Sequence, residues 1–175
     1  GKAYARDVQD VIQRGSSGSI AAFIAEPIQG VGGVIEMPPS YLQHAYEYVR
    51  DAGGICISDE VQTGFGRTGE HFWGFENNNV VPDMVVMAKG IGNGCPLAAV
   101  VTTKEIAQSM TEAIHFNTFG GNPVSCAQGL ATLEVILEDD LQGNAKRLGE
   151  QLFAGFADLQ NKYACIGDVR GKGLM

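Results

Sequence analysis

The sequence lacks the features that identify membrane-spanning, metal-binding and nucleic-acid-binding proteins. It has no apolar run long enough to cross a bilayer, and it has none of the CxxC pairs typical of zinc and redox sites. Basic residues are scarce, because 12 Lys and Arg stand against 20 Asp and Glu and the net charge is −8. An acidic chain binds nucleic acids and anionic membrane surfaces poorly, so we expect neither as a partner.

Cysteine and histidine are also few and scattered. The four cysteines are Cys56, Cys95, Cys126 and Cys165. Most of them have apolar or small neighbours and nothing indicates secretion, so we expect reduced thiols in the core. The three histidines, His44, His71 and His115, share no ligand spacing, and no structural metal is predicted.

The two ends of the sequence resemble interior positions of a longer chain. The sequence begins without Met and stops at "GKGLM", where a strand is expected to begin. We therefore expect a fragment, in which a targeting segment can be neither seen nor excluded.

What the sequence does have is a globular composition, with 45% apolar and 18% charged residues over 175 positions. Buried strands are predicted within 19–30, 54–61, 83–89 and 97–103. Helices are predicted within 3–14, 38–53, 103–110 and 144–160, and a further helix is expected to begin at 123. This alternation indicates an α/β fold with a mostly parallel sheet flanked by helices.

Several predicted helices have residues typical of N-terminal caps, and two have an apolar stripe. The expected N-terminal caps are Ser40 with Gln43, Thr102 with Glu105, and Asn122 before Pro123. The helix within 38–53 also has a single apolar stripe, which consists of Leu42, Ala45, Tyr46 and Val49. A further stripe is predicted at Leu148, Leu152, Phe156 and Leu159.

Ionisable residues follow three of the predicted strands. Glu26 follows the first, Asp59 and Glu60 follow the second, and Lys89 follows the third. Ligands of open parallel sheets bind beyond the carboxyl ends of the strands, so these residues are candidates for a functional site. Asp59 and Lys89 could form a structural ion pair, or they could hold pyridoxal phosphate, which binds as a lysine Schiff base with an acidic partner on its ring nitrogen.

Two glycine patterns have competing interpretations. "GFGRTG" fits the G-x-G-x-x-G pattern of dinucleotide sites, but the following "EHFWGFENNN" is a poor start for the helix such a site needs. "KGIGNG" lacks the Walker spacing, and its glycines more plausibly let the backbone turn tightly beside a ligand.

Taken together, the motifs resemble the class III pyridoxal-phosphate-dependent aminotransferases, which have the fold type I architecture. The matching runs are "AEPIQGVGG", "ISDEVQTGFGRTG", "DMVVMAKGIGNGCPLAAV", "NTFGGNP" and "DVRGKGLM", and they follow the family's order along nearly the whole chain.

The resemblance implies a role for each matching position. Lys89 would form the Schiff base and later carry a proton, and Asp59 would pair with the pyridinium nitrogen. Val61 would pack on the ring face, and Gln62 would hydrogen-bond the phenolic oxygen. Thr118 would reach the phosphate of a neighbouring subunit's cofactor, which implies a homodimer or larger homo-oligomer with a shared site.

The remaining implied role belongs to Glu26, which would lie on the substrate side and pair with an arginine that binds carboxylates. Each of these residues also has a structural alternative. Glu26 and Gln62 could be hydrogen-bonding partners that order a loop, Thr118 could be a turn hydroxyl, and Val61 could be core packing.

The resemblance also implies an activity: ping-pong transfer of an amino group from an alanine-like donor to a 2-oxo acid such as glyoxylate or pyruvate. A phospho-lyase acting on an amino-alcohol phosphate is an alternative within the family, and a catalytically silent dimerisation module is an alternative outside it. Within the family the most similar members imply a mitochondrial location.

The same comparison predicts two domains. Residues 1–140 would belong to the large cofactor-binding domain, and residues 141–175 would begin a small C-terminal α/β domain. The glycine-rich phosphate loop and a C-terminal arginine of the family are expected outside this sequence.

Overall fold

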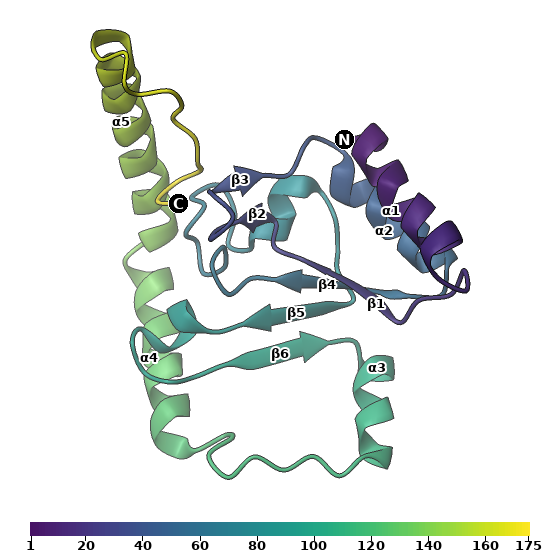
Figure 1. Cartoon of the computed structure of the whole chain (residues 1–175). Helices are drawn as coiled ribbons and strands as arrows, with labels where there is room; N and C mark the ends of the chain where they lie inside the picture. Colours follow the sequence, from purple (N-terminus) through teal and green to yellow (C-terminus); the bar gives the residue numbers. More distant parts are fainter.

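A computed structural model describes all residues, 1–175, and gives an α/β fold built on a four-stranded sheet. The strands β1 (Ala22–Ala25), β4 (Ile55–Asp59), β5 (Met84–Met87) and β6 (Ala99–Thr102) lie in the order β1-β4-β5-β6. The first three are parallel and β6 is antiparallel to β5, as Figure 1 shows. The predicted mostly parallel sheet is therefore confirmed.

The helices α1 (Lys2–Gly15) and α2 (Tyr41–Asp51) pack side by side next to β1 and β4. The predicted stripe of α2 is confirmed, because Leu42, Ala45, Tyr46 and Val49 are all buried. The main apolar cluster consists of Ile12, Leu42, Tyr46, Val49, Cys56 and Val80. Burial of this stripe, rather than helix propensity alone, holds α2 on the sheet.

Two of the three predicted caps are wrong. Ser40 has a left-handed backbone and makes no side-chain cap bond to α2, while Gln43 Nε2 donates to the backbone carbonyl of Asn78 instead. The cap of α3 (Lys104–Ser109) is Thr103 rather than Thr102, whose hydroxyl donates to the Asp83 carbonyl. Both errors arise because partners distant in the sequence compete for the side chain.

The strands are less buried than the sequence predicted. Ile24 of β1 is 59% exposed, and Val100 of β6 is 58% exposed. The cause is the layering, because the helices of this chain cover one face of the sheet over β1 and β4 and leave the other face open. No helix is both long and apolar enough for a membrane span.

Short elements fill the connections between the strands. A hairpin of β2 (Ile28–Gln29) and β3 (Ile35–Glu36) follows β1. The 3-10 helices η1 (Gly74–Asn78) and η2 (Lys89–Gly92) precede and follow β5, and η3 (Met110–Glu112) continues α3. These connections bring backbone groups close to the carboxyl ends of the strands, where the candidate residues lie.

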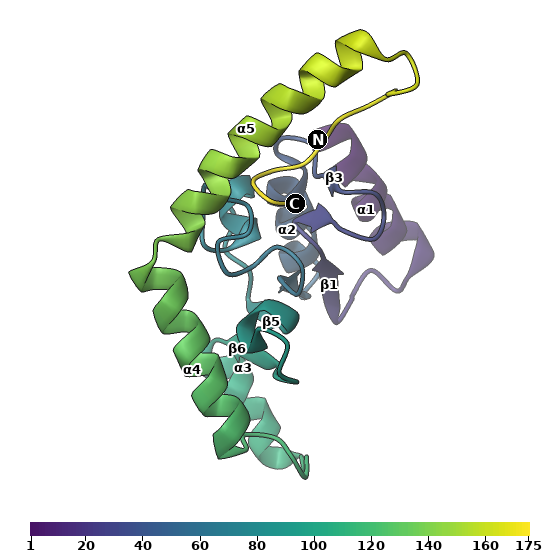
Figure 2. The same cartoon turned by 90° about the vertical axis from the view of Figure 1, so that its left-hand side faces the viewer.

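Two long helices form one side of the molecule. The predicted Asn122 cap is confirmed at α4 (Pro123–Glu138), where its side chain accepts a hydrogen bond from the Ser125 N–H at 3.0 Å. Helix α5 (Leu141–Lys162) follows α4 after a bend and extends beyond the sheet (Figure 2). Its predicted stripe is partly exposed, with Leu148, Leu152, Phe156 and Leu159 between 39% and 47% accessible.

The last residues return from α5 to the loop that follows β4 (Figure 1). The Leu174 N–H donates to the Arg67 carbonyl at 3.0 Å, and Lys172 Nζ lies 2.9 Å from a Glu70 carboxylate oxygen. The hydrogen bond from Lys172, together with its charge, lowers the pKa of Glu70. The segment is therefore tied to the same loop that carries the candidate residues.

The cysteines only partly follow the prediction. All four are unpaired, but Cys56 alone is buried, and Cys126 and Cys165 are exposed, because α4 and the end of the chain contribute little to the core.

Burial, which outweighs the nearby charge of Arg50, raises the pKa of Cys56 to about 11. We expect the folded protein at pH 8 to alkylate at Cys165 while Cys56 stays unmodified, because the thiolate is the reactive form. Mass spectrometry of iodoacetamide-treated protein checks this expectation. Denatured protein is the control, in which both thiols should react, and equal labelling of Cys56 and Cys165 in the folded protein would contradict it.

Candidate active site

The ionisable residues that follow three predicted strands come to one edge of the sheet. Ala25 of β1 pairs with Ser58 of β4, so Glu26 lies beside Asp59. Asp59 in turn pairs with Val86 of β5, three residues before Lys89. Because β1, β4 and β5 are parallel neighbours, their carboxyl ends form a single edge, which is where open α/β sheets bind ligands.

Lys89 has an unusual backbone at this edge. Its φ is 46°, in the left-handed region that costs a non-glycine residue roughly 1–3 kcal/mol. Its side chain is exposed. It takes part in none of the five ion pairs, so the alternative of a structural Asp59–Lys89 pair is wrong.

Asp59 is the last residue of β4 and is half-buried. Its Oδ1 accepts a hydrogen bond from the Val61 N–H at 3.0 Å, which orients the carboxylate and leaves Oδ2 free. Successive side chains of a strand alternate between its faces, so Asp59 points away from the side on which Cys56 and Ser58 are buried. The carboxylate therefore faces the open side of the sheet.

The loops after β4 and β5 pack directly on each other. A Cβ at Gly90 would lie 3.3 Å from the Phe65 ring, so a larger residue there would press on that ring. Phe65 itself has φ 64° and stacks edge-on against Phe72 and Trp73. The glycine that follows Lys89 thus lets an aromatic cluster approach the loop.

Two hollows meet at these loops. An open one of about 770 Å³ is lined by Lys89 and by the residues that follow it, and a second of about 420 Å³ lies between the loops and helix α4. Arg67, Gly90 and Asn93 line both hollows, so the two are adjacent. Arg67 and Lys89 are the cationic residues along their walls, which favours a negatively charged ligand.

Val61, Gln62 and Glu26 surround this edge. Val61 and Gln62 are half-buried in the turn after Asp59, and Gln62 packs against Gly30 of the loop between β2 and β3. Glu26 Oε2 accepts a hydrogen bond from the Gly30 N–H at 2.6 Å. The structural alternative for Glu26 therefore has support, since within this chain it orders its own loop.

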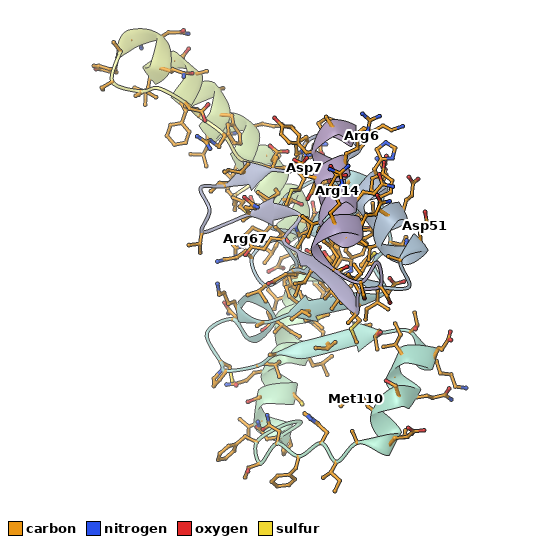
Figure 3. The ribbon with its side chains drawn as sticks, turned by 45° about the vertical axis from the view of Figure 1, so that its right-hand side comes forward. Arg6, Asp7, Arg14, Asp51, Arg67 and Met110 are labelled. Carbon is orange, nitrogen blue, oxygen red and sulfur yellow. The ribbon has the colours of Figure 1, made fainter.

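Thr118 lies elsewhere. It belongs to the exposed segment 113–121, which crosses from α3 to α4 at the lower end of the molecule in Figure 1. Figure 3 shows the same separation, with Met110 at that lower end and Arg67 on the loop after β4. The structure therefore brings Glu26, Asp59, Val61, Gln62 and Lys89 together and leaves Thr118 outside the group.

Sequence reasoning missed the role of Glu60. We expected this residue only as one of two acids after a strand, but it is fully buried and accepts four hydrogen bonds. A local signal existed in the hydroxyl residues Ser58 and Thr63 on either side of it. The other two donors lie 14 and 15 residues further along the chain and have no sequence signature.

Comparison with known proteins shows many similar chains. All of residues 1–175 match the aminotransferase class-III family. The chain is 56% identical over 173 residues to the mitochondrial alanine–glyoxylate aminotransferase 2 of Homo sapiens, covering 98% of this chain and 34% of that protein. It is 59% identical over 175 residues to the mitochondrial homolog 2 of that enzyme in Arabidopsis thaliana, covering 100% of this chain and 36% of that protein.

Solved structures agree with this result. A transaminase from the marine bacterium Virgibacillus has a TM-score of 0.92 at 37% identity, covering 99% of this chain and 40% of that one. An Arthrobacter phospholyase in complex with phosphoethanolamine has a TM-score of 0.92 at 39% identity, covering 99% and 42%. A Toxoplasma gondii ornithine aminotransferase with partial occupancy of PLP at its active site has a TM-score of 0.89 at 34% identity, covering 97% and 39%.

The chain spans about a third of the length of the curated relatives it matches. The match is nevertheless continuous along these 175 residues, and it includes every strand end described above. The fold, the motifs and the comparisons lead to one conclusion: this chain belongs to the class III aminotransferase family.

Proposed function

We propose that the protein is an aminotransferase that moves an amino group from an alanine-like amino acid to a 2-oxo acid such as glyoxylate or pyruvate. The observation that carries the proposal is the placement of Lys89 and Asp59 at the ends of adjacent parallel strands, in a chain 56–59% identical to alanine–glyoxylate aminotransferases. A ping-pong cycle follows, because one lysine site serves the donor and the acceptor in turn.

The residues at this edge fit pyridoxal phosphate, the cofactor of the family. Lys89 offers an amine with no carboxylate partner, and Asp59 offers a carboxylate oxygen that can accept a hydrogen bond from a ring N–H. Gln62 would bind the phenolic oxygen and Val61 would pack on the ring. When bound, pyridoxal phosphate supplies an aldehyde for the amino group and a ring that stabilises negative charge at the substrate carbon.

Three side chains of this chain would then have separate roles in the reaction. The Lys89 Nζ, as a free amine, would take the proton from the α carbon of the amino acid and deliver it to the carbon that is the aldehyde of the free cofactor, and it would reverse both transfers with the 2-oxo acid. Asp59 would hold the proton on the ring nitrogen by its negative charge. Glu26 would stay on the substrate side, where it could pair with a carboxylate-binding arginine.

We propose a homodimer with a shared active site. The segment 113–121, which carries Thr118, lies apart from the end of β5 within one chain (Figure 1), so the Thr118 hydroxyl could serve the cofactor of a second copy. The segment around it is exposed and carries large apolar side chains, including Ile114, Phe116 and Phe119. A partner subunit that covers this segment would remove that apolar area from water.

Domain organisation and location follow from the same relatives. Residues 1–140 would form part of the large cofactor-binding domain, and α5 with the returning segment would begin the small domain. A mitochondrial location is proposed because the relatives of highest identity carry that location in their names.

The phospho-lyase alternative keeps one specific observation in its favour, since the Arthrobacter phospholyase matches with a TM-score of 0.92. Its identity of 39% is well below the 56–59% of the alanine–glyoxylate aminotransferases. A silent dimerisation module is disfavoured because both Lys89 and Asp59 are present. Incubation with phosphoethanolamine separates the enzymatic alternatives, because only the lyase releases phosphate.

The test of the proposal uses the full-length protein. Pyridoxal phosphate is added, the complex is reduced with borohydride, and the digested protein is searched for the pyridoxylated peptide by mass spectrometry. We expect the label on Lys89 and none on Lys104, an exposed lysine of α3 that serves as the internal control. Folded protein without label at Lys89 would contradict the catalytic proposal.

A further inference from the structure

Glu60 is the one charged residue of the chain that is buried, with 0% exposure. None of the five ion pairs includes it. A buried carboxylate without a counter-ion lowers stability unless hydrogen bonds replace its lost hydration. The site chemistry described above makes no use of this residue, although it directly follows Asp59.

Four donors surround the Glu60 carboxylate. Its Oε1 accepts from the Ser58 hydroxyl at 3.0 Å and from the Phe75 N–H at 2.8 Å. Its Oε2 accepts from the Thr63 hydroxyl and from the Gly74 N–H, both at 2.7 Å. Two backbone N–H groups, which only donate, and two hydroxyls that can donate suit an ionised carboxylate, which accepts only.

The surrounding backbone is shaped to this carboxylate. A Cβ at Gly74 would lie 2.6 Å from the Thr63 Cβ and 3.1 Å from Glu60 Oε2, so the N–H groups at the start of η1 approach this closely because position 74 is glycine. The hydrogen bonds to Gly74 and Phe75 thereby fix Glu60 to a segment that is not otherwise part of the sheet edge.

Fixing Glu60 also fixes its neighbours. Side chains alternate along an extended chain, so a Glu60 held on the buried side leaves Asp59 on the open side. The Glu60 N–H donates to the Val86 carbonyl at 2.8 Å, which ties this point of the chain to the strand that leads to Lys89. The Asp59 carboxylate is then oriented by its own bond to the next N–H, that of Val61.

We propose that Glu60 is a positioning residue for the cofactor site: its four-donor network holds the Asp59 carboxylate in the orientation that binds the cofactor's ring nitrogen. This inference rests on the proposed cofactor role of Asp59. A positioning role differs from a purely structural one because a change at Glu60 should alter the affinity for the cofactor and the pH midpoint of the bound cofactor's absorption, in addition to stability.

Replacing Glu60 with glutamine keeps nearly the same side-chain shape but disturbs the hydrogen bonds of the network. Each oxygen of Glu60 receives one hydroxyl and one backbone N–H. A glutamine at this position must place its NH₂ against one of those two N–H groups in either orientation, and a backbone N–H cannot reverse its direction as a hydroxyl can.

The experiment compares Glu60→Gln, Asp59→Asn and Glu76→Gln in the full-length protein. Glu76 is the matched control, because it is a nearby carboxylate that accepts a single bond from the Trp73 N–H, which an amide oxygen can keep. Three quantities are measured: the dissociation constant of pyridoxal phosphate, the pH midpoint of the absorption change of the bound cofactor, and the melting temperature of the apoprotein.

We expect Glu60→Gln to weaken cofactor binding about tenfold, as loss of an outer-shell partner does in metal sites, and to move the pH midpoint in the same direction as Asp59→Asn. Glu76→Gln should leave the dissociation constant and the pH midpoint at their wild-type values. If Glu60→Gln lowers only the melting temperature, the positioning role is overturned and the network is structural.

The Asp59→Asn result separates the two proposals. If Asp59→Asn changes cofactor affinity and the pH midpoint while Glu60→Gln changes neither, only the positioning role of Glu60 fails. If Asp59→Asn changes neither, the proposed role of Asp59 fails and the inference fails with it. If Glu60→Gln does not fold, Thr63→Val, which removes one of the four donors, takes its place under the same criteria.

Discussion

Full-length protein carrying Lys89→Ala is expected to lose amino transfer by roughly 10⁴-fold in kcat, the upper limit of what removing a positioned acid–base group costs. The large effect follows because Lys89 would both bind the cofactor covalently and carry the substrate proton. The measurement is steady-state transfer from alanine to glyoxylate at saturating pyridoxal phosphate.

The control for this substitution is Lys104→Ala. Lys104 is also exposed and lies at the start of α3, away from the edge where β4 and β5 end, so its loss should leave kcat unchanged. A Lys89→Ala protein that stays folded and retains a tenth or more of the activity would show that another group carries the proton.

Asp59→Asn is expected to lower kcat about 10²- to 10³-fold, the usual cost of removing one preorganised electrostatic group. The amide has nearly the same shape and can still accept the bond from the Val61 N–H at 3.0 Å, so the change removes mainly the negative charge. Without that charge, position 59 would hold a proton on the ring nitrogen of a bound cofactor less firmly, and the ring would then stabilise negative charge at the substrate carbon less well.

Asp51→Asn provides the comparison for this second substitution. Asp51 is an exposed carboxylate at the end of α2, labelled in Figure 3 on the side of the molecule formed by α1 and α2. Its change should leave both kcat and cofactor affinity intact. Equal activity of the Asp59→Asn and wild-type proteins would mean that Asp59 does not contact the ring.

The parts of the fold that the sequence predicted are those set by local patterns. The stripe of α2 repeats at helical spacing, and all four of its residues are buried as expected. The Asn122 cap also needs only the three residues that follow it.

The errors occur where a distant segment changes a local preference. Gln43 bonds a carbonyl 35 residues away instead of closing a capping box, and Thr102 bonds the carbonyl of Asp83 on the adjacent strand. Exposure of the strands could not be predicted from their apolar character, because it depends on how many layers cover the sheet.

The candidate site also has parts that the sequence predicted and parts that it did not. Asp59 and Lys89 were found because each ends an apolar run, and the sheet then places them at one edge. The buried network of Glu60 was missed, because half of its donors are backbone N–H groups of η1, which any amino acid can supply.

Judged by backbone conformation alone, position 89 would be occupied by glycine. Its φ of 46° favours a residue without a Cβ. If Lys89 has the role proposed above, a lysine here reflects a trade-off in which stability is given up for chemistry. Variants selected only for thermal tolerance should tend to lose this side chain, so a stabilisation experiment that aims to keep the proposed activity must hold position 89 constant.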